Sequence, residues 1–549
     1  MSIIAAHHSP EFRSIPFERL PGFTKSWRAV TSRDSRASEL YPRAPAEAKA
    51  CGQAAEETLR QPRPWQALAD IIGDSSRYYG VPNRALDRLD LLAAGKAVMV
   101  VTGQQVGYLG GPLYTFVKAY HATRLAAELE RQLGLPVLPL FWLEGRDHDL
   151  EEVRHASYLN AAGELLTLRF APEQEIPGYE VGKYPVSAEV HLKELAYGLE
   201  FSHEADLSLL GSAYSQTTLA DAMGRWLAST LGPRGLLVIE GMDPRLKVLA
   251  APLWEKILSA GSHLTDLFYA RTQVLEAAGW DTPMSPTRDA YLFYLTGEHR
   301  RASLTYSGQL KHPDGHSETL SATELHNLIR RTPDALSPKA ALRPPYQDYL
   351  LPTIAYVAGP GEMDYHAQLT PFYREFGITP PSLFPRLSVT ILDRKIERQL
   401  ERAGQTAEEV LATSAHDLSK EAVRRADDGQ TSVLFEESRA QIEVIFQRLR
   451  EKVRAIDPTL AGAAQAAAGR ALHPLAQLQE KTERALKQKH ATALTRLEKI
   501  LHALRPRDQL AERVLCSGYY VARYGLKEIL AALDELPAVP NEHFVLTLE

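Results

Sequence analysis

The chain has 549 residues, of which 44% are hydrophobic and 24% charged, an ordinary composition for a soluble globular protein. At this length we expect several domains, or one large core with insertions. Lysine and arginine number 62 against 68 aspartate and glutamate, so the net charge of −6 gives no electrostatic case for binding nucleic acid or an anionic membrane.

The sequence lacks signals of secretion and membrane insertion. Its first residues, MSIIAAHHSPEF, carry neither a basic segment nor a long apolar run. No apolar run reaches the roughly 18 residues that a membrane span needs. Cys51 and Cys516 are the only cysteines, too few for a disulfide framework or a cysteine-rich metal site. We therefore expect a cytoplasmic protein.

Short apolar strands alternate with helices between about residues 96 and 390. This alternation predicts an α/β fold with a parallel sheet and right-handed crossovers. Two intervals, about 160–215 and 262–345, are too long for simple connections, and we expect inserted subdomains there. The predicted strands are 97–102, 137–143, 236–240 and 353–359.

The segment Val98–Leu113, VMVVTGQQVGYLGGPL, joins a buried strand to a glycine-rich turn and a helix. Glycines let the backbone approach a ligand closely, and the free amides of a helix start bind phosphate or carboxylate. The alternative is a tight turn without a ligand. Polar residues at the carboxyl end of the strand, where open α/β sheets bind ligands, favour a site. Its candidate binding residues are Thr102, Gly103, Gln104, Gln105, Gly110 and Gly111.

Acidic residues and a histidine follow the second predicted strand. The run Asp147-His148-Asp149 could bind a metal, act in acid–base catalysis or hold a loop by hydrogen bonds. His148 and His155 are seven residues apart, which does not suit a two-histidine metal site, so we expect no protein-bound metal. We favour a carboxylate-rich site for an amine or hydroxyl groups. His148 could also accept a proton, because histidine titrates near neutrality.

Two more candidate segments flank the predicted strand 353–359. After it, Gly359-Pro360-Gly361 leads into a helix whose first turn carries Glu362 and Asp364. The helix dipole favours acidic residues there, and for Asp364 we favour this structural explanation. For Glu362 a binding role is equally supported, because it follows a strand at the same sheet edge as the first glycine turn. Before the strand, Arg343 could grip both oxygens of a carboxylate.

The sequence from about residue 391 predicts a helical domain. We expect two antiparallel helices, the second near 494–504, joined by a turn within the alanine- and glycine-rich segment 457–470. The first helix has an apolar seam with the spacing of a coiled coil, formed by Ile442, Phe446, Leu449, Val453, Ile456 and Leu460.

Four segments, in this order, resemble the bacillithiol-biosynthesis cysteine-adding enzymes, a family of cysteine ligases: VTGQQVGYLGGPLYTFVKA, FWLEGRDHDLEEVRHA, LRPPYQDYLLPTIAYVAGPGEMDYHAQL and FPRLSVTIL. The likeness covers nearly the whole chain, with Ala358 where a glycine is often seen. It implies a Rossmann-like core over 1–390 with connecting-peptide insertions, as in class I aminoacyl-tRNA synthetases. It also implies a coiled-coil domain over 391–505 that forms a homodimer, and a segment 506–549 that packs back on the core.

The reaction implied by the resemblance adds L-cysteine to the amine of glucosaminyl-malate and gives bacillithiol. A carboxylate is a poor acyl donor, so the energetics favour activation by ATP, for which Mg²⁺ is a candidate partner ion. The chain has neither the ATP signatures of class I synthetases nor a GxxxxGK[ST] loop. Two alternatives stay open: another acyl-adenylate or nucleotidyl-transfer enzyme, and a non-catalytic coiled-coil scaffold on a degenerate Rossmann domain.

For this reaction we assign roles by residue chemistry. His148, with Asp147, is the candidate base near the attacking amine. Gly110 and Gly111 are expected to hold phosphate. Ammonium or hydroxyl groups suit Asp147, Asp149 and Glu362, and carboxylates suit Lys118, Arg343 and Arg386. Further candidate binding residues within the resembling segments are Tyr114, Gly359, Gly361, Gln368 and Ser388.

Overall fold

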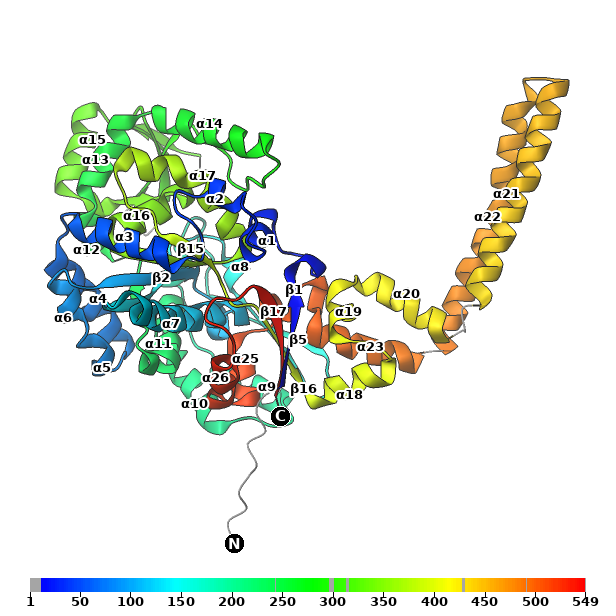
Figure 1. The fold of residues 1–549 in the computed structure, drawn as a ribbon, viewed down its shortest axis with the longest axis horizontal. Helices are drawn as coiled ribbons and strands as arrows, with labels where there is room; N and C mark the ends of the chain where they lie inside the picture. Colours follow the sequence, from blue (N-terminus) through cyan, green and yellow to red (C-terminus); the bar gives the residue numbers. More distant parts are fainter. Residues whose placement is uncertain are drawn as a thin grey trace, which may run out of the picture. The chain divides into compact units, whose positions relative to one another are not determined.

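The computed structural model describes residues 11–241, 243–295, 301–312, 315–426, 430–489 and 491–548. The chain divides into two units (Figure 1). The first combines residues 1–392 with 509–549, and the second consists of residues 393–508. In the described part of the chain, no helix has the length and apolar character needed to cross a membrane.

A five-stranded parallel sheet lies at the centre of the first unit, as the alternation of strands and helices predicts. Its order is β15–β14–β2–β3–β8. The four predicted strands are all present, and a fifth, β15, was not predicted. The inner strands are buried along nearly their whole length, which explains their continuous apolar sequences. The strands are β2 (Val98–Gln105), β3 (Val137–Glu144), β8 (Leu237–Glu240), β14 (Thr353–Ala358) and β15 (Ser382–Pro385).

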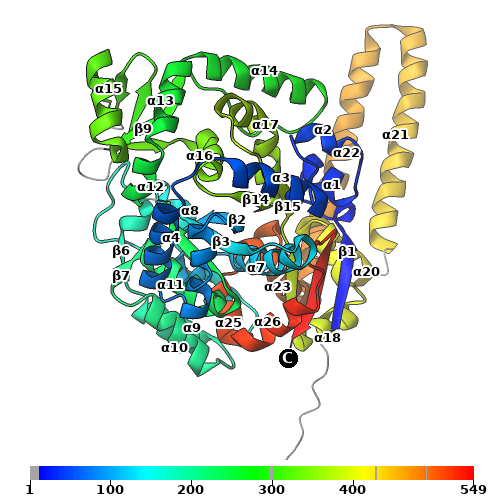
Figure 2. The ribbon, with the colours of Figure 1, turned by 60° about the vertical axis from the view of Figure 1, so that its left-hand side comes forward.

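Helices pack on this sheet and supply the core (Figure 2). The helix α7 (Leu113–Leu133) packs on β2 and β3, and α3 (Ala48–Arg60) packs on β14. Both α4 (Trp65–Tyr79) and α11 (Leu219–Leu231) contact β8. One core cluster joins side chains of α3, β2, α7 and β14, among them Cys51, Val100, Leu125 and Ile354. Helix α7 follows β2 in the chain and begins near the edge of the sheet formed by the carboxyl ends of the strands.

The two long intervals carry secondary structure of their own. The first contains the hairpin β4 (His155–Leu159) and β5 (Leu165–Arg169), then α9 (Glu189–Gly198) and α10 (Glu204–Ala213). The second holds a five-stranded sheet of order β12–β11–β10–β9–β13 beside two helices. Its elements are α14 (His263–Ala277), β9 (Asp289–Leu295), β10 (Arg301–Thr305), β11 (Gln309–Lys311), β12 (Ser317–Thr319), α15 (Ala322–Arg331) and β13 (Leu336–Pro338).

The C-terminal segment belongs to the first unit. Its last strand, β17 (Glu542–Leu548), pairs antiparallel with β1 (Glu11–Pro16) in a sheet of order β1–β17–β16, where β16 is Val389–Asp393. Two of its helices, α24 (Ala511–Val514) and α25 (Ser517–Tyr524), pack on α7. The segment therefore reaches the helix that begins at the carboxyl end of β2.

The second unit corrects the predicted pairing of its helices. Its two long helices, α21 (Gln430–Ile456) and α22 (Leu460–Lys489), pack on each other. The segment predicted as a turn is mostly helix, and only residues 457–459 connect the two. Alanine has the highest helix propensity, so the alanine run extends the helix despite its glycines. The other predicted partner, α23 (Ala491–Leu504), packs on α18 (Arg394–Ala403), α19 (Ala407–Ala412) and α20 (Ala415–Ala426).

Candidate functional site

A cavity of about 720 Å³ opens at the carboxyl ends of β2, β3 and β14. This is the sheet edge at which the sequence predicts a ligand site. The last residues of β2 and β3 and the turn after β14 form part of its wall. Twelve of the predicted site residues line it: Gly103, Gln104, Gln105, Tyr114, Lys118, Asp147, His148, Arg343, Gly359, Gly361, Glu362 and Arg386.

Three predicted binding side chains instead make structural contacts in the interior. The Thr102 hydroxyl donates to the carbonyl of Val357 at 2.9 Å, which joins β2 to β14. The Gln368 amide donates to the carbonyl of Met284 at 2.9 Å. Both side chains are fully buried, as is that of Ser388. The structure does not bring these three side chains to the lining of the cavity, so it gives no support to their predicted binding roles.

The glycine turn also faces away from the cavity. The backbone N–H of Gly110 donates to the hydroxyl of Tyr214 at 2.8 Å, and that of Gly111 donates to the carbonyl of Tyr108 at 3.0 Å. These amides are occupied within the protein, and the predicted phosphate-binding role is corrected. Gly110 has φ +84°, and a Cβ there would overlap the hydroxyl of Ser517. Glycine is needed at this position for close packing.

We expect Gly110→Ala to lower the free energy of unfolding by about 2–5 kcal/mol, because the new methyl group adds steric overlap to an unfavourable backbone conformation. Chemical denaturation of the full chain measures the loss. Gly469→Ala in α22 is the matched control, since a Cβ there meets no heavy atom within 4 Å. If Gly110→Ala is as stable as wild type, Gly110 and Ser517 do not pack this closely in solution.

A buried ion pair lies in the wall of the cavity. The ammonium of Lys118, on α7, donates to the carboxylate of Glu362 and to the carbonyl of Gly103, the latter at 2.8 Å. Glu362 lies in the first turn of α17 (Pro360–Phe376) and also accepts from the Gly359 N–H at 2.6 Å and the Tyr356 hydroxyl at 2.7 Å. The Glu362 carboxylate, which was predicted to bind a substrate ammonium group, is therefore already paired with the ammonium group of Lys118.

Burial and charge act in opposite directions on this pair. Burial lowers the pKa of Lys118 to about 8, although the carboxylate beside it opposes the shift. Burial also disfavours ionisation of Glu362, but Lys118 and the donated hydrogen bonds outweigh it and lower the pKa of this carboxyl. Glu362 is thus held as a carboxylate.

Basic side chains outnumber acidic ones in the cavity lining, seven to four, although the whole chain is acidic. Five of the seven have a carboxylate oxygen within 4.0 Å: Lys118, Arg146, Arg301, Lys339 and Arg386, which pair with Glu362, Glu144, Asp147, Asp289 and Glu512 respectively. Arg343 and Arg513 have no such carboxylate among the residues that the structure describes. Arg343 and Arg513 are therefore the basic side chains of the lining whose charge no nearby carboxylate among the described residues offsets.

Arg343 is the first residue of α16 (Arg343–Leu350), and in the described part of the chain its side-chain partners are neutral and at long hydrogen-bond distances. Its guanidinium lies 3.3 Å from the side-chain oxygen of Gln347, 3.3 Å from the hydroxyl of Tyr365 and 3.4 Å from that of Tyr356. Such a guanidinium can exchange these weak contacts for a bidentate pair with a carboxylate or phosphate.

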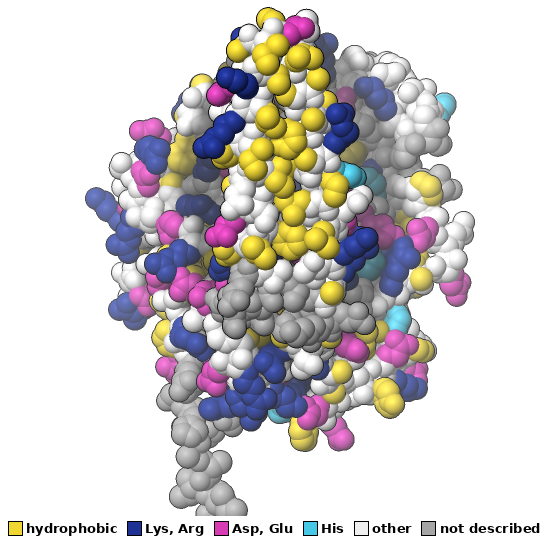
Figure 3. All heavy atoms as spheres, turned by 90° about the vertical axis from the view of Figure 1, so that its right-hand side faces the viewer, with side chains coloured by type: hydrophobic (Ala, Val, Ile, Leu, Met, Phe, Trp, Pro, Cys, Tyr) yellow, Lys and Arg dark blue, Asp and Glu magenta, His cyan; other side chains and the backbone are white. Residues whose placement is uncertain are grey.

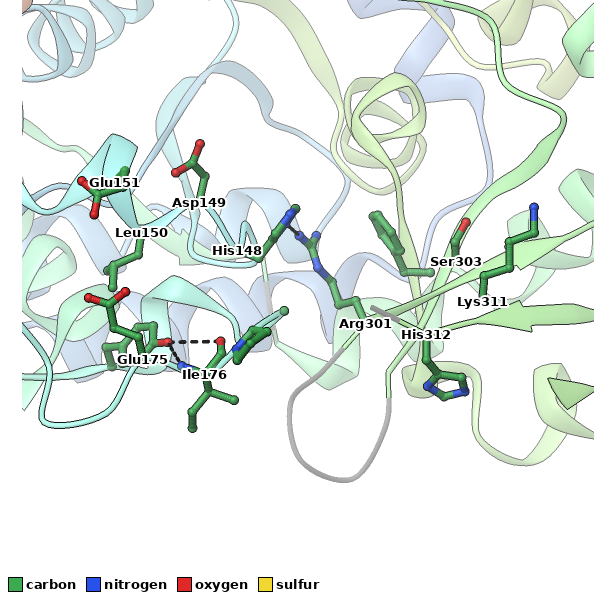
Figure 4. A pocket seen from close by; sticks show the side chains of 14 residues that line it. His148, Asp149, Leu150, Glu151, Glu175, Ile176, Arg301, Ser303, Lys311 and His312 are labelled. Atoms are coloured by element: carbon green, nitrogen blue, oxygen red, sulfur yellow. Dashed lines mark hydrogen bonds between the residues drawn. The ribbon is translucent and has the colours of Figure 1, made fainter. Parts of the chain in front are cut away.

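His148 lies on the loop after β3, with 59% of its side chain exposed. Its Nδ1 is 2.7 Å from Nη2 of Arg301 on β10, and Figure 4 shows the two side chains pointing toward each other. Since the guanidinium can only donate, a neutral imidazole uses its one acceptor nitrogen here. The neighbouring Asp147 carboxylate accepts from the backbone N–H of His148 at 2.7 Å and from Gln105 Nε2 at 2.5 Å. The predicted base thus faces a cation from an inserted subdomain.

Asp149 lies outside the main cavity and lines a second one of about 610 Å³, which shares His148, Phe293 and Arg301 with the first (Figure 4). Its carboxylate accepts from the Glu152 N–H at 3.3 Å and caps the short helix α8 (Leu150–Val153). Its predicted role in the main site is therefore corrected to a helix cap.

The prediction missed several lining residues. Arg146 directly precedes the predicted site residue Asp147, so its place in the cavity could have been predicted from the sequence. Arg301 and Lys339 come from the second inserted subdomain, and Arg513 comes from the C-terminal segment. Nothing in the local sequence of these three indicates that they reach the sheet edge.

Comparison with known proteins decides the family. The family model described as "Bacillithiol biosynthesis BshC, N-terminal Rossmann-like domain" matches residues 12–387, and "Bacillithiol biosynthesis BshC, C-terminal coiled-coil domain" matches residues 389–548. The chain belongs to the BshC family. The resemblance seen in the sequence and the Rossmann-like and coiled-coil fold classes are confirmed.

Curated members of the BshC family named "Putative cysteine ligase BshC" are similar along most of their length. The Salinibacter ruber protein is 31% identical over 88% of each chain. The Geobacillus thermodenitrificans protein is 30% identical over 86% of this chain and 88% of its own. The Bacillus licheniformis protein is 30% identical over 88% and 90%.

Proposed function

We propose that this member of the BshC family is a cysteine ligase that adds L-cysteine to the amine of glucosaminyl-malate, with ATP activating the cysteine carboxylate. The observation that carries the proposal is the cationic cavity at the sheet edge, with two arginines that lack a carboxylate partner among the described residues. The malate group and ATP are both anions, and the names of the relatives supply the ligase class and cysteine.

The two arginines fit the anionic groups of these substrates. A guanidinium binds both oxygens of a carboxylate or a phosphate, and Arg343 and Arg513 are charged and line the cavity. Bound ATP, with Mg²⁺ on its phosphates, would transfer its adenylyl group to the cysteine carboxylate and release pyrophosphate, which would give a mixed anhydride with AMP as a good leaving group. We assign Arg343 to a substrate carboxylate.

The neutral substrate amine attacks the activated carbon and loses a proton as the C–N bond forms and the leaving group departs. We assign this proton to His148. Its Nδ1 lone pair becomes available once Arg301 turns to an anionic substrate, because the guanidinium then has a stronger partner than a neutral imidazole.

Binding can be tested before turnover. A ligand that prefers the native state raises the melting temperature; at 100 times its Kd it adds about 2.7 kcal/mol of stability. We expect glucosaminyl-malate and MgATP each to raise the melting temperature of the full chain. Arg343→Gln should weaken the response to the carboxylate substrate, whereas Arg84→Gln, an exposed arginine outside the cavity, should not. No response to either compound would contradict the proposal.

We also propose a homodimer formed through the α21–α22 hairpin, in the cytoplasm. Figure 3 shows apolar side chains along this hairpin. The exposed large ones include Val444, Ile445, Leu449 and Ile456, of which Ile456 is 76% exposed. A monomer would leave them in water, and a second copy would cover them. Both cysteines are buried and unpaired, which suits a reducing compartment.

Ile445→Glu with Leu449→Glu, at two of these exposed positions, is expected to yield a monomer, because two charges on each hairpin cannot be buried in a shared apolar interface. Sedimentation at micromolar concentration measures the change. Glu443→Gln and Glu451→Gln, on exposed positions of the same helix, serve as controls and should leave the dimer intact. A wild-type chain that sediments as a monomer would contradict the assembly.

A further inference from the structure

The C-terminal segment brings to the cavity one arginine that has not yet been assigned to a substrate group. Arg513 lies on α24, and its guanidinium carbon is 5.7 Å from the centre of the Tyr114 ring. The guanidinium carbon of Arg386 is 5.2 Å from the same ring. The Tyr114 hydroxyl accepts a hydrogen bond from Gln104 at 3.2 Å, and all four residues line the cavity.

The two arginines are not equivalent. Arg386 is buried and donates to both oxygens of Glu512, at 2.6 and 3.0 Å. Glu512 is itself fully buried and also accepts from the hydroxyl of Ser388 at 2.8 Å and the N–H of Val389 at 2.9 Å. Arg386 is therefore neutralised and fixed in place, and its N–H groups toward Glu512 cannot serve a ligand. For its predicted role as a partner of a substrate carboxylate, Arg386 is therefore less available than an arginine without an internal carboxylate.

Arg513 has the opposite properties. It is exposed, and in the described part of the chain no carboxylate lies within 4.0 Å of its guanidinium. Contact with an aromatic face holds the planar guanidinium by a cation–π interaction and leaves its N–H groups free. Its backbone is anchored, because the adjacent residue is the buried Glu512. An arginine of this kind loses little conformational entropy when it binds an oxyanion.

We propose that Arg513 binds an oxyanion group of a substrate, a carboxylate or a phosphate, on a platform made by Tyr114 and the Arg386–Glu512 pair. The inference rests on the proposed function for the identity of the substrates. In that reaction the carboxylates of glucosaminyl-malate and the phosphates of ATP both have the required chemistry. The C-terminal segment thereby becomes a part of the substrate site that determines specificity.

Steady-state kinetics of the full chain distinguish the two sources. Arg513→Gln should raise the KM for one substrate about 10–100-fold, the usual worth of a charge-assisted hydrogen-bond pair, and leave kcat nearly unchanged. A higher KM for glucosaminyl-malate assigns a carboxylate, and a higher KM for ATP assigns a phosphate. Arg513→Lys should recover part of the affinity, and the exposed Arg84→Gln should match wild type. Unchanged KM values for both substrates would overturn the inference.

Direct binding separates this inference from the proposed function. Isothermal titration calorimetry with L-malate and with pyrophosphate requires no turnover. If the wild type forms no bacillithiol but binds one of these anions, and Arg513→Gln binds it at least tenfold more weakly, the oxyanion site stands and the proposed function fails. If the wild type forms bacillithiol and Arg513→Gln has wild-type KM values and anion binding, the oxyanion site alone fails.

Discussion

We expect His148→Ala to lower kcat for bacillithiol formation by about 10²–10⁴-fold, the usual contribution of a positioned acid–base group, while KM values change little. The His148 side chain is 59% exposed, and its Nδ1 lies 2.7 Å from Nη2 of Arg301 and 3.2 Å from Oδ1 of Asp147. Removing it leaves no cavity in the core, so the melting temperature should stay near that of wild type. Turnover, KM and melting temperature are measured on the same preparation.

Arg301→Gln is the matched control for this prediction. If His148 accepts the proton, Arg301→Gln removes a donor to its ring but keeps the base, so its KM rises and its loss in kcat is much smaller. If His148 merely holds Arg301 in place, the two variants should raise KM alike. Near-normal kcat for His148→Ala would remove it from the catalytic residues and leave Asp147, its neighbour in the cavity, as the candidate base.

The second large effect is on stability. Glu512→Gln is expected to lower the free energy of unfolding by about 3–5 kcal/mol, because it leaves the buried Arg386 charge without its counter-ion. Three other hydrogen bonds to the carboxylate depend on the same side chain. Denaturant unfolding of the full chain measures the loss.

Two further variants test the cause of this loss. Glu56→Gln removes an exposed partner from the Arg60–Glu56 pair on α3 and should cost little, since solvent screens that pair. Combining Glu512→Gln with Arg386→Met removes the unpaired charge and should recover part of the stability. A Glu512→Gln protein as stable as wild type would show that Arg386 and Glu512 are not paired in the folded chain.

The sheet and the place of the site could be predicted because both follow from local patterns. Strands such as Val137–Glu144 are continuous apolar runs, and the carboxyl ends of parallel strands meet at one edge. Polar residues just after these runs, including Gln105, His148 and Glu362, therefore reach one cavity.

The rest depends on partners far along the chain. The sequence around Gly110 is typical of an anion site. However, the backbone N–H of Gly110 donates to the hydroxyl of Tyr214, which lies 104 residues away in the sequence. Arg386 is an expected carboxylate ligand until Glu512, 126 residues later, binds it. The helix pairing was wrong for a local reason, because an alanine-rich run was interpreted as a turn although alanine favours helix.

The proposed ligation is tested most directly by turnover of the purified full chain with L-cysteine, glucosaminyl-malate and MgATP, followed by mass detection of the product. We expect the mass of bacillithiol only when all three compounds are present, and a strong loss of that product with His148→Ala. Absence of the product from the complete mixture, or its formation at the same rate without ATP, would contradict the proposed function.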